Sequence, residues 1–192
     1  GDANTMNGWF YKGGGQEFYR ELTQDILGLN VVGFFGMPMP AQPFGWFKNP
    51  VTQASDVNGL KYRTVGLAAD LCAAMGMSVV QLPGGEIVPA MERGVIDAFE
   101  FNNPTADRRF GAQDVAKNYM LGSFHQASEC FEIDFNKDTY DELPDDLKAI
   151  VKYAVEASAT ANLAKAIDNY SKDLQGLITE DDVAGEIGKV IC

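Results

Sequence analysis

Residues 59–101 constrain the fold more than any other part of the chain, because short apolar runs alternate there with helical segments almost without linkers. The pattern predicts three strands and the two helices between them: Leu60–Val65, Leu67–Met75, Ser78–Leu82, Pro83–Gly94 and Val95–Phe101. A glycine follows each helix, as expected for a left-handed cap. Strands that alternate with helices form parallel sheets with right-handed crossovers. The segment therefore predicts an α/β fold with a mainly parallel sheet.

The segments before and after this unit have simpler patterns. Trp9–Leu27 is expected to start loosely, with a triple glycine at Gly13–Gly15, and then to become helical, and Leu29–Gly36 is a short apolar strand. Met37–Pro50 is a proline-rich loop, since its prolines remove backbone donors. After Pro104, the chain is expected to be helical up to Met120.

The C-terminal part predicts one strand and one long helix. Glu129–Phe135 alternates apolar and polar side chains, which is typical of a half-exposed strand. Apolar residues then keep helical spacing from Asp145 to Leu177, far beyond the mean helix of about 11–12 residues. Pro144 suits the first turn of this helix, and the acidic residues that follow face the positive end of its dipole.

Composition excludes several classes of function. A chain of 192 residues with 46% hydrophobic residues can bury a core and form one or two domains. Its net charge of −12, without a cluster of basic residues, argues against nucleic acid and anionic membrane surfaces as partners. No apolar run is long enough to span a bilayer. No signal peptide is visible, but an exported protein without its leader would look the same.

The three cysteines do not indicate a metal or disulfide framework. Cys72, Cys130 and Cys192 are far apart and odd in number, and no CxxC spacing occurs. Cys72 and Cys130 lie in apolar surroundings, so we expect both to be buried thiols.

Two charged residues stand at the ends of predicted strands, where α/β sheets bind ligands. Arg63 either grips a carboxylate with its planar fork or makes an internal or solvent-facing contact. Glu100, between two phenylalanines, needs a cation, which can be arginine or a metal. Gln42 can offer a neutral oxygen to a hard cation.

His125, the only histidine, is expected to be structural, and no catalytic triad can be assembled around it.

Several ordered blocks resemble the solute-binding proteins of TRAP transporters, in the branch that binds 2-oxo acids, lactate and related carboxylates. The blocks are GLKYRTVG, LPGGEIVPAMERGVIDAFEF with the following Pro104, GSFHQ, and NKDTYDELPDDLKAIV. They extend from about Trp9 into the long helix and occur in the family's order.

The resemblance implies a role for each unusual residue. The family's carboxylate-clamping arginine corresponds to Arg63, and its metal-ligating glutamine to Gln42. The metal-ligating glutamate corresponds to Glu100, and the aromatic residue whose main-chain oxygen also coordinates corresponds to Phe101. We therefore expect Arg63, Phe101 and Asn102 in the substrate site, and Gln42, Glu100 and Phe101 around a sodium or calcium ion.

The chain also departs from the family pattern. Phe101 stands where the branch usually has tryptophan, and Asn102 and Asn103 replace smaller or apolar residues. The chain is considerably shorter than family members, so we expect a truncated chain without the family's first lobe. Such a chain by itself is expected to bind its ligand weakly or undetectably, with the metal site empty or filled by solvent. The expected division is a ligand-binding second lobe at 9–98, a segment returning to the first lobe at 99–139, a long helix at 140–177 and an acidic tail at 178–192.

These observations predict a periplasmic receptor, not an enzyme, that delivers a small 2-oxo or 2-hydroxy acid to TRAP membrane subunits. The alternative from another class is a small α/β enzyme with Glu100 as general base and Arg63 as substrate anchor. A third reading is a fragment that folds only as a dimer and has no ligand function. Because the first lobe is expected to be missing, we also expect the chain to self-associate, through the long helix or through an exposed face of the lobe.

Overall fold

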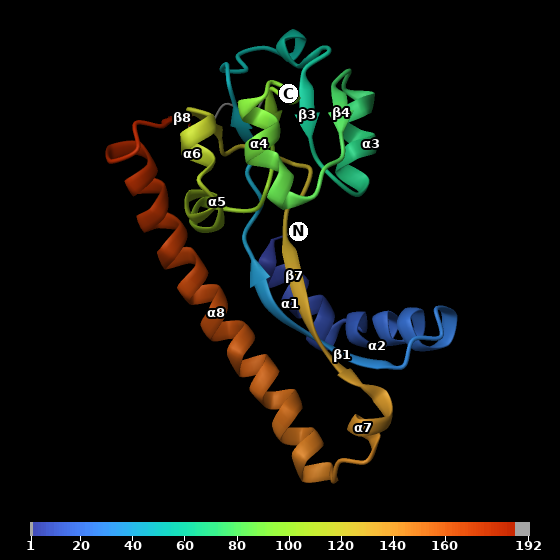
Figure 1. The fold of residues 1–192 in the computed structure, drawn as a ribbon. Coiled ribbons are helices and arrows are strands. Elements are labelled where there is room, and N and C mark those ends of the chain that lie inside the picture. Colours follow the sequence, from blue (N-terminus) through green and yellow to red (C-terminus); the bar gives the residue numbers. More distant parts are fainter. Residues whose placement is uncertain (1, 187–192) are drawn as a thin grey trace. The chain divides into compact units, whose positions relative to one another are not determined.

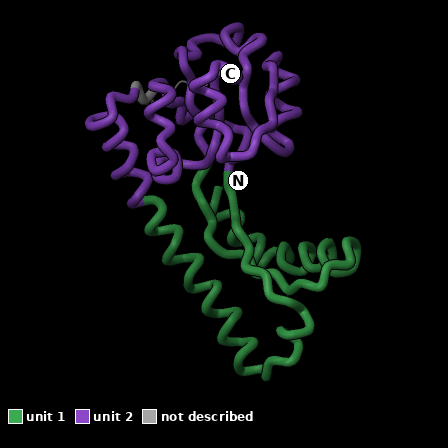
Figure 2. Tube along the Cα trace, in the orientation of Figure 1, with its two compact units in different colours: residues 1–41, 128–167 green, residues 42–127, 168–192 purple. Residues whose placement is uncertain are grey.

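The computed structural model describes residues 2–186, which divide into two compact units (Figure 2). Of these residues, unit 1 contains 2–41 and 128–167, and unit 2 contains 42–127 and 168–186. The expected lobe at 9–98 thus draws on both units, and the functional division by sequence range stays a prediction. Cys192 lies outside the described residues.

Unit 1 is built on a two-stranded antiparallel sheet (Figure 1). Its elements are α1 (Ala3–Lys12), α2 (Gly15–Arg20), the π-helix η1 (Glu21–Ile26), β1 (Val31–Met39), β7 (Glu129–Asn136), α7 (Lys137–Asp141) and the first part of α8 (Asp145–Thr179). The predicted strand at 129–135 and the long helix are both confirmed. Strand β1 extends three residues past the predicted end, into the expected loop.

Side chains from the N-terminal helices attach to β1. The Gln16 amide donates to the carbonyl of Gly33 and the Gln24 amide to that of Val31, each at 2.7 Å. Glycine is needed in the preceding turn, because a Cβ on Gly15 would lie 2.8 Å from the ring of Trp9. Cys130, expected to be buried, is only half-buried, and its Sγ lies 3.1 Å from the carbonyl oxygen of Gly36.

Unit 2 contains a six-stranded sheet in the order β4-β3-β5-β2-β6-β8. The strands are β2 (Gly45–Phe47), β3 (Lys61–Arg63), β4 (Ser78–Val80), β5 (Ala98–Phe99), β6 (Asn118–Met120) and β8 (Ala184–Glu186). Strand β3 is parallel to β4 and β5, as predicted, but β2 is antiparallel to both β5 and β6. The sheet is therefore mixed, because β2 enters from outside the alternating βαβ segment.

Short helices complete unit 2: η2 (Ala54–Val57), α3 (Leu67–Ala74), η3 (Gly84–Glu86), α4 (Ile87–Glu92), α5 (Pro104–Phe110) and α6 (Ala112–Val115). The predicted helix from 104 to 120 was wrong in two respects. Gly111 has φ 84° and ends α5, and residues 118–120 form β6. Pairing of β6 with β2 outweighs the local helical preference.

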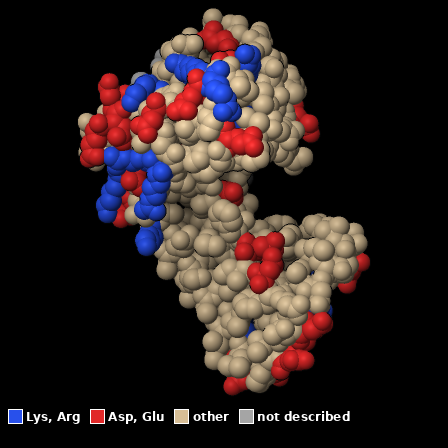
Figure 3. Space-filling model, in the orientation of Figure 1, with Lys and Arg blue, Asp and Glu red and all other residues tan. Residues whose placement is uncertain are grey.

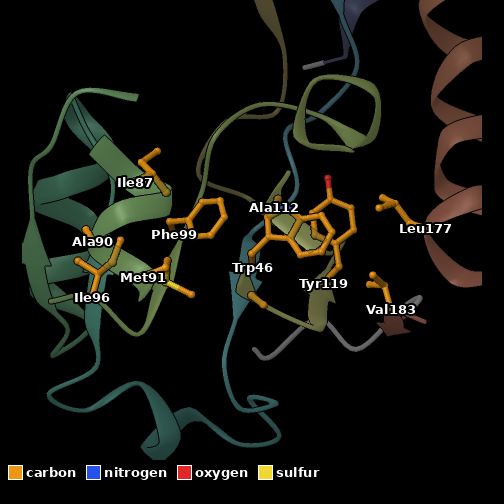
Figure 4. Close-up of a cluster of buried hydrophobic side chains, with 11 residues drawn as sticks. Trp46, Ile87, Ala90, Met91, Ile96, Phe99, Ala112, Tyr119, Leu177 and Val183 are labelled. Carbon is orange, nitrogen blue, oxygen red and sulfur yellow. The ribbon is translucent and has the colours of Figure 1, made fainter. Parts of the chain in front are cut away.

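The core of unit 2 joins the sheet to its helices (Figure 4). Trp46 and Tyr119 stack at 4.1 Å between ring centroids and are fully buried. Leu177, near the end of α8, packs in the same cluster.

Arg108 on α5 pairs with Asp173, Glu180 and Asp181, and Figure 3 shows interleaved charges over this end of α8. Within residues 2–186, none of the helices is both long and apolar enough to cross a bilayer.

Candidate functional site

Arg63 ends β3 and is 6% exposed. Its Nε donates to the carbonyl of Leu82 at 3.0 Å. Its Nη1 donates to the main-chain oxygen of Glu100 at 2.9 Å and to Glu100 Oε1 at 3.0 Å. The second terminal nitrogen, Nη2, has no hydrogen-bond partner among residues 2–186. The Nε and Nη1 groups of Arg63 are thus held by the protein, and the N–H groups of Nη2 are left to donate to a ligand.

Glu100 follows β5 and is 5% exposed. The N–H of Glu100 donates to the carbonyl of Arg63 at 3.2 Å, because β3 and β5 are adjacent parallel strands. Its second carboxylate oxygen accepts a hydrogen bond from the amide of Gln42, which is also 5% exposed. Arg63 and Glu100, expected at the ends of strands, thus lie at one edge of the sheet, and Gln42 is within hydrogen-bonding reach of Glu100. We call these three residues the site cluster.

Gly45 allows the Gln42 loop to reach Glu100. Its φ is 122°, and a Cβ there would lie 2.1 Å from the carbonyl oxygen of Phe99. Only glycine tolerates this conformation together with such a close backbone approach. The resulting β2–β5 pairing, with Trp46 opposite Phe99, places residues 42–44 beside the end of β5.

Phe101 packs next to the site cluster. Its ring stacks on Phe110 with centroids 4.4 Å apart and planes 15° apart. The ring of Phe101 also lies close to Gly84, because a Cβ added to Gly84 would be 3.0 Å from Phe101 Cε2. Gly84 in the Pro83–Glu86 turn therefore leaves space for the aromatic ring of Phe101.

Asp107 was not recognised in the sequence, although it lies at the centre of the hydrogen bonds behind the site. It is 1% exposed and accepts four hydrogen bonds, from the indole of Trp46, the hydroxyl of Tyr119, and the N–H groups of Asn102 and Asn103. Burial raises the pKa of Asp107 to about 6, although the four bonds oppose the shift. An acidic residue in the first turn of a helix is common, so sequence alone offers no signal of this role.

His125 is partly buried near Phe44, with ring centroids 6.4 Å apart. Its Nδ1 is hydrogen-bonded to the hydroxyl of Ser123, and burial lowers its pKa. Nothing in the described contacts connects this ring to the site cluster, and its structural role stays a prediction.

The donor set of the site cluster fits a hard cation. Glu100 supplies a carboxylate, and rotating the Gln42 amide about its last bond would place a carbonyl oxygen beside it. Across residues 2–186, His, Cys, Asp and Glu form no group of three or more that could hold a metal. Any cation at this site would therefore depend on one carboxylate supplemented by neutral oxygens.

Comparison with known proteins identifies the family. Residues 2–187 match the bacterial extracellular solute-binding proteins of family 7. The chain belongs to this family. A monocarboxylate 2-oxoacid-binding periplasmic protein from Nostoc sp. is 33% identical over 160 residues, which are 83% of this chain and 43% of the relative.

Two solved structures show the same fold in TRAP periplasmic solute-binding proteins. The protein from Pseudoalteromonas atlantica T6c, with bound sodium and pyruvate, is 30% identical with a TM-score of 0.84. The match covers 97% of this chain and 56% of that one. The protein from Bordetella bronchiseptica RB50, a dimer with calcium and picolinate, is 27% identical with a TM-score of 0.87, over 99% and 56% of the two chains.

The chain thus spans about half the length of these relatives. The family is one of extracellular solute-binding proteins, and the solved relative from Pseudoalteromonas atlantica is a TRAP periplasmic binding protein. The alternative of a small enzyme with Glu100 as general base is not retained.

Proposed function

We propose that this protein binds a small 2-oxo or 2-hydroxy acid for delivery to TRAP membrane subunits. Arg63 would bind the carboxylate, with Phe101 and Asn102 lining the substrate site. Gln42, Glu100 and the main-chain carbonyl of Phe101 would hold a sodium or calcium ion. The bound cation would supply positive charge to the ligand's oxygen atoms. Relatives that bind pyruvate or 2-oxo acids support this ligand class.

The observation that carries the proposal is the buried site cluster. An arginine, a glutamate and a glutamine, each 5–6% exposed, meet at the carboxyl end of adjacent parallel strands. Charged side chains are almost never fully buried unless paired, and such edges are where open α/β sheets bind ligands.

The contacts of Arg63 also predict cooperation between the two ligands. Its Nη1 is occupied by Glu100, so a ligand carboxylate meets a complete fork only when Glu100 releases this nitrogen. Release without a new partner would leave buried charge unpaired, which is costly. A cation held by Glu100 and a carboxylate held by Arg63 compensate both charges. Each ligand should therefore strengthen the binding of the other.

The substitution Arg63→Lys tests the carboxylate role. Lysine keeps the charge but loses the planar fork, so pyruvate affinity in the presence of Na⁺ or Ca²⁺ should fall about tenfold or more. Isothermal titration calorimetry measures the change. Lys61→Arg, at the exposed start of the same strand, is the matched control and should bind pyruvate as the wild type does. Unchanged affinity of Arg63→Lys for pyruvate and for other 2-oxo acids would remove Arg63 from the site.

We also propose that the chain self-associates through α8. Leu147, Ile150 and Tyr153 form a stripe on this helix at three-residue spacing and are 42%, 61% and 63% exposed. Large exposed apolar surfaces usually mark contacts with another protein, and the Bordetella relative is a dimer.

Light scattering after size-exclusion chromatography should report a dimer for the wild type and for the conservative variant Ile150→Val. The variant Ile150→Lys should shift the population toward monomer, because it places a charge in the stripe. Monomeric wild type at all concentrations would contradict the proposal.

A further inference from the structure

The carboxylate of Asp107 divides its four hydrogen bonds between two parts of unit 2. Its Oδ2 accepts from Trp46 Nε1 at 2.9 Å and from the Tyr119 hydroxyl at 3.0 Å. Its Oδ1 accepts from the N–H of Asn102 at 3.0 Å and from that of Asn103 at 3.2 Å. One oxygen is thus anchored in the core, and the other holds the turn that follows β5.

The bond to Asn102 determines the direction of the Phe101 carbonyl. The Asn102 N–H and the Phe101 C=O belong to one planar trans peptide, so they point in opposite directions. Holding the N–H against Asp107 directs the Phe101 oxygen away from the core. The bond to Asn103 restrains the next peptide, so the turn has little freedom to rotate.

The bond to Trp46 extends the same control to Gln42. Trp46 lies in β2, opposite Phe99 of β5, and follows Gln42 by four residues. The core oxygen of Asp107 therefore restrains β2, the strand that directly follows the Gln42 loop, while its other oxygen restrains the peptide that carries the Phe101 carbonyl.

We propose that Asp107 is a positioning residue for the cation site, orienting the main-chain carbonyl of Phe101 relative to Gln42 and Glu100. This inference rests on the proposed function, because the cation site is itself a proposal. Asp107 contacts no ligand and acts through the peptides and side chains that it fixes. Partners behind a metal ligand typically change metal affinity tenfold to a hundredfold when they are replaced.

The substitution Asp107→Asn provides the test, since it keeps the shape of the side chain. A carboxylate accepts all four bonds, but asparagine has one acceptor oxygen and an NH₂ group that must face donors. Calorimetric titration with Ca²⁺ should show an affinity about tenfold to a hundredfold below that of the wild type. Asp107→Glu keeps the acceptors and displaces them, so it should also weaken Ca²⁺ binding and serves if the asparagine variant does not fold.

Two controls separate positioning from a general loss of stability. Arg108 follows Asp107 on α5, and Arg108→Met removes its ion pairs with Asp173, Glu180 and Asp181 but leaves the Asn102 turn untouched. Tyr119→Phe removes one bond to the core oxygen of Asp107 and leaves both bonds to the turn. Both variants should melt at lower temperature but bind Ca²⁺ within about twofold of wild type, because the Phe101 peptide stays held.

The outcomes distinguish the two proposals. Loss of Ca²⁺ affinity in folded Asp107→Asn or Asp107→Glu, but not in the controls, supports the positioning role. Wild-type affinity in a folded Asp107 variant, with loss in Glu100→Gln, overturns that role and leaves the cation site intact. A wild type that takes up no Ca²⁺, or a Glu100→Gln variant that binds it equally well, overturns the cation site and with it this inference.

Discussion

Replacing Glu100 with glutamine is expected to destabilise the chain by about 3–5 kcal/mol, because it leaves Arg63 as an uncompensated buried charge. The two side chains are 7% exposed each and their charged atoms are 3.0 Å apart. The same change removes the single carboxylate of the proposed cation site, so Ca²⁺ affinity should fall by at least about a hundredfold. Denaturant unfolding measures the first effect and Ca²⁺ calorimetry the second.

A matched control exists at the surface. Asp168→Asn is the same chemical change in an ion pair with Lys172, whose side chains are 59% and 71% exposed. Exposed i,i+4 pairs contribute only about 0.3–0.5 kcal/mol, so this variant should unfold almost as the wild type does and keep its Ca²⁺ affinity. Equal stability losses in the two variants would show that the Arg63–Glu100 contact is not a buried pair in solution.

The second large effect is expected from Gly45→Ala. The added Cβ would lie 2.1 Å from the Phe99 oxygen, 2.8 Å from its carbonyl carbon and 3.0 Å from the Cα of Glu100. All three atoms are backbone, so relief requires β2 to move away from β5. Together with the strain of a φ of 122°, the cost should reach about 4 kcal/mol, at the upper end for single substitutions.

Gly85→Ala provides the control for this prediction. A Cβ at Gly85 meets nothing within 4 Å, so the variant should stay within about 0.5 kcal/mol of wild type. Thermal unfolding followed by circular dichroism measures both changes. Gly45→Ala should also lose Ca²⁺ affinity, because the Gln42 loop depends on the β2–β5 contact. A Gly45→Ala variant as stable as Gly85→Ala would show that β2 does not approach β5 this closely.

The local sequence pattern was sufficient to predict the helices and strands whose own apolar side chains repeat with a helical or strand period. The alternation at 59–101 predicted β3, α3, β4, α4 and β5 in order. The spacing of apolar residues predicted α8, and period-two alternation predicted β7. Arg63 and Glu100 could be selected because each interrupts an apolar strand end, and Gln42 because it is the polar residue of an apolar loop. The resemblance to the family added roles for these residues, which stay proposals.

Only the tertiary structure decided the rest. Strands β2 and β6 have three residues each, which are too few to show a periodic pattern in the sequence. They form because each pairs with neighbouring strands of the sheet. The need for glycine at position 45 depends on Phe99, which is distant in sequence. Asp107 looks like an ordinary helix-start acid, and its importance comes from Trp46, 61 residues away. Periodicity records which face of an element is buried, but a close backbone approach or a shared carboxylate depends on partners that meet only when the chain has folded.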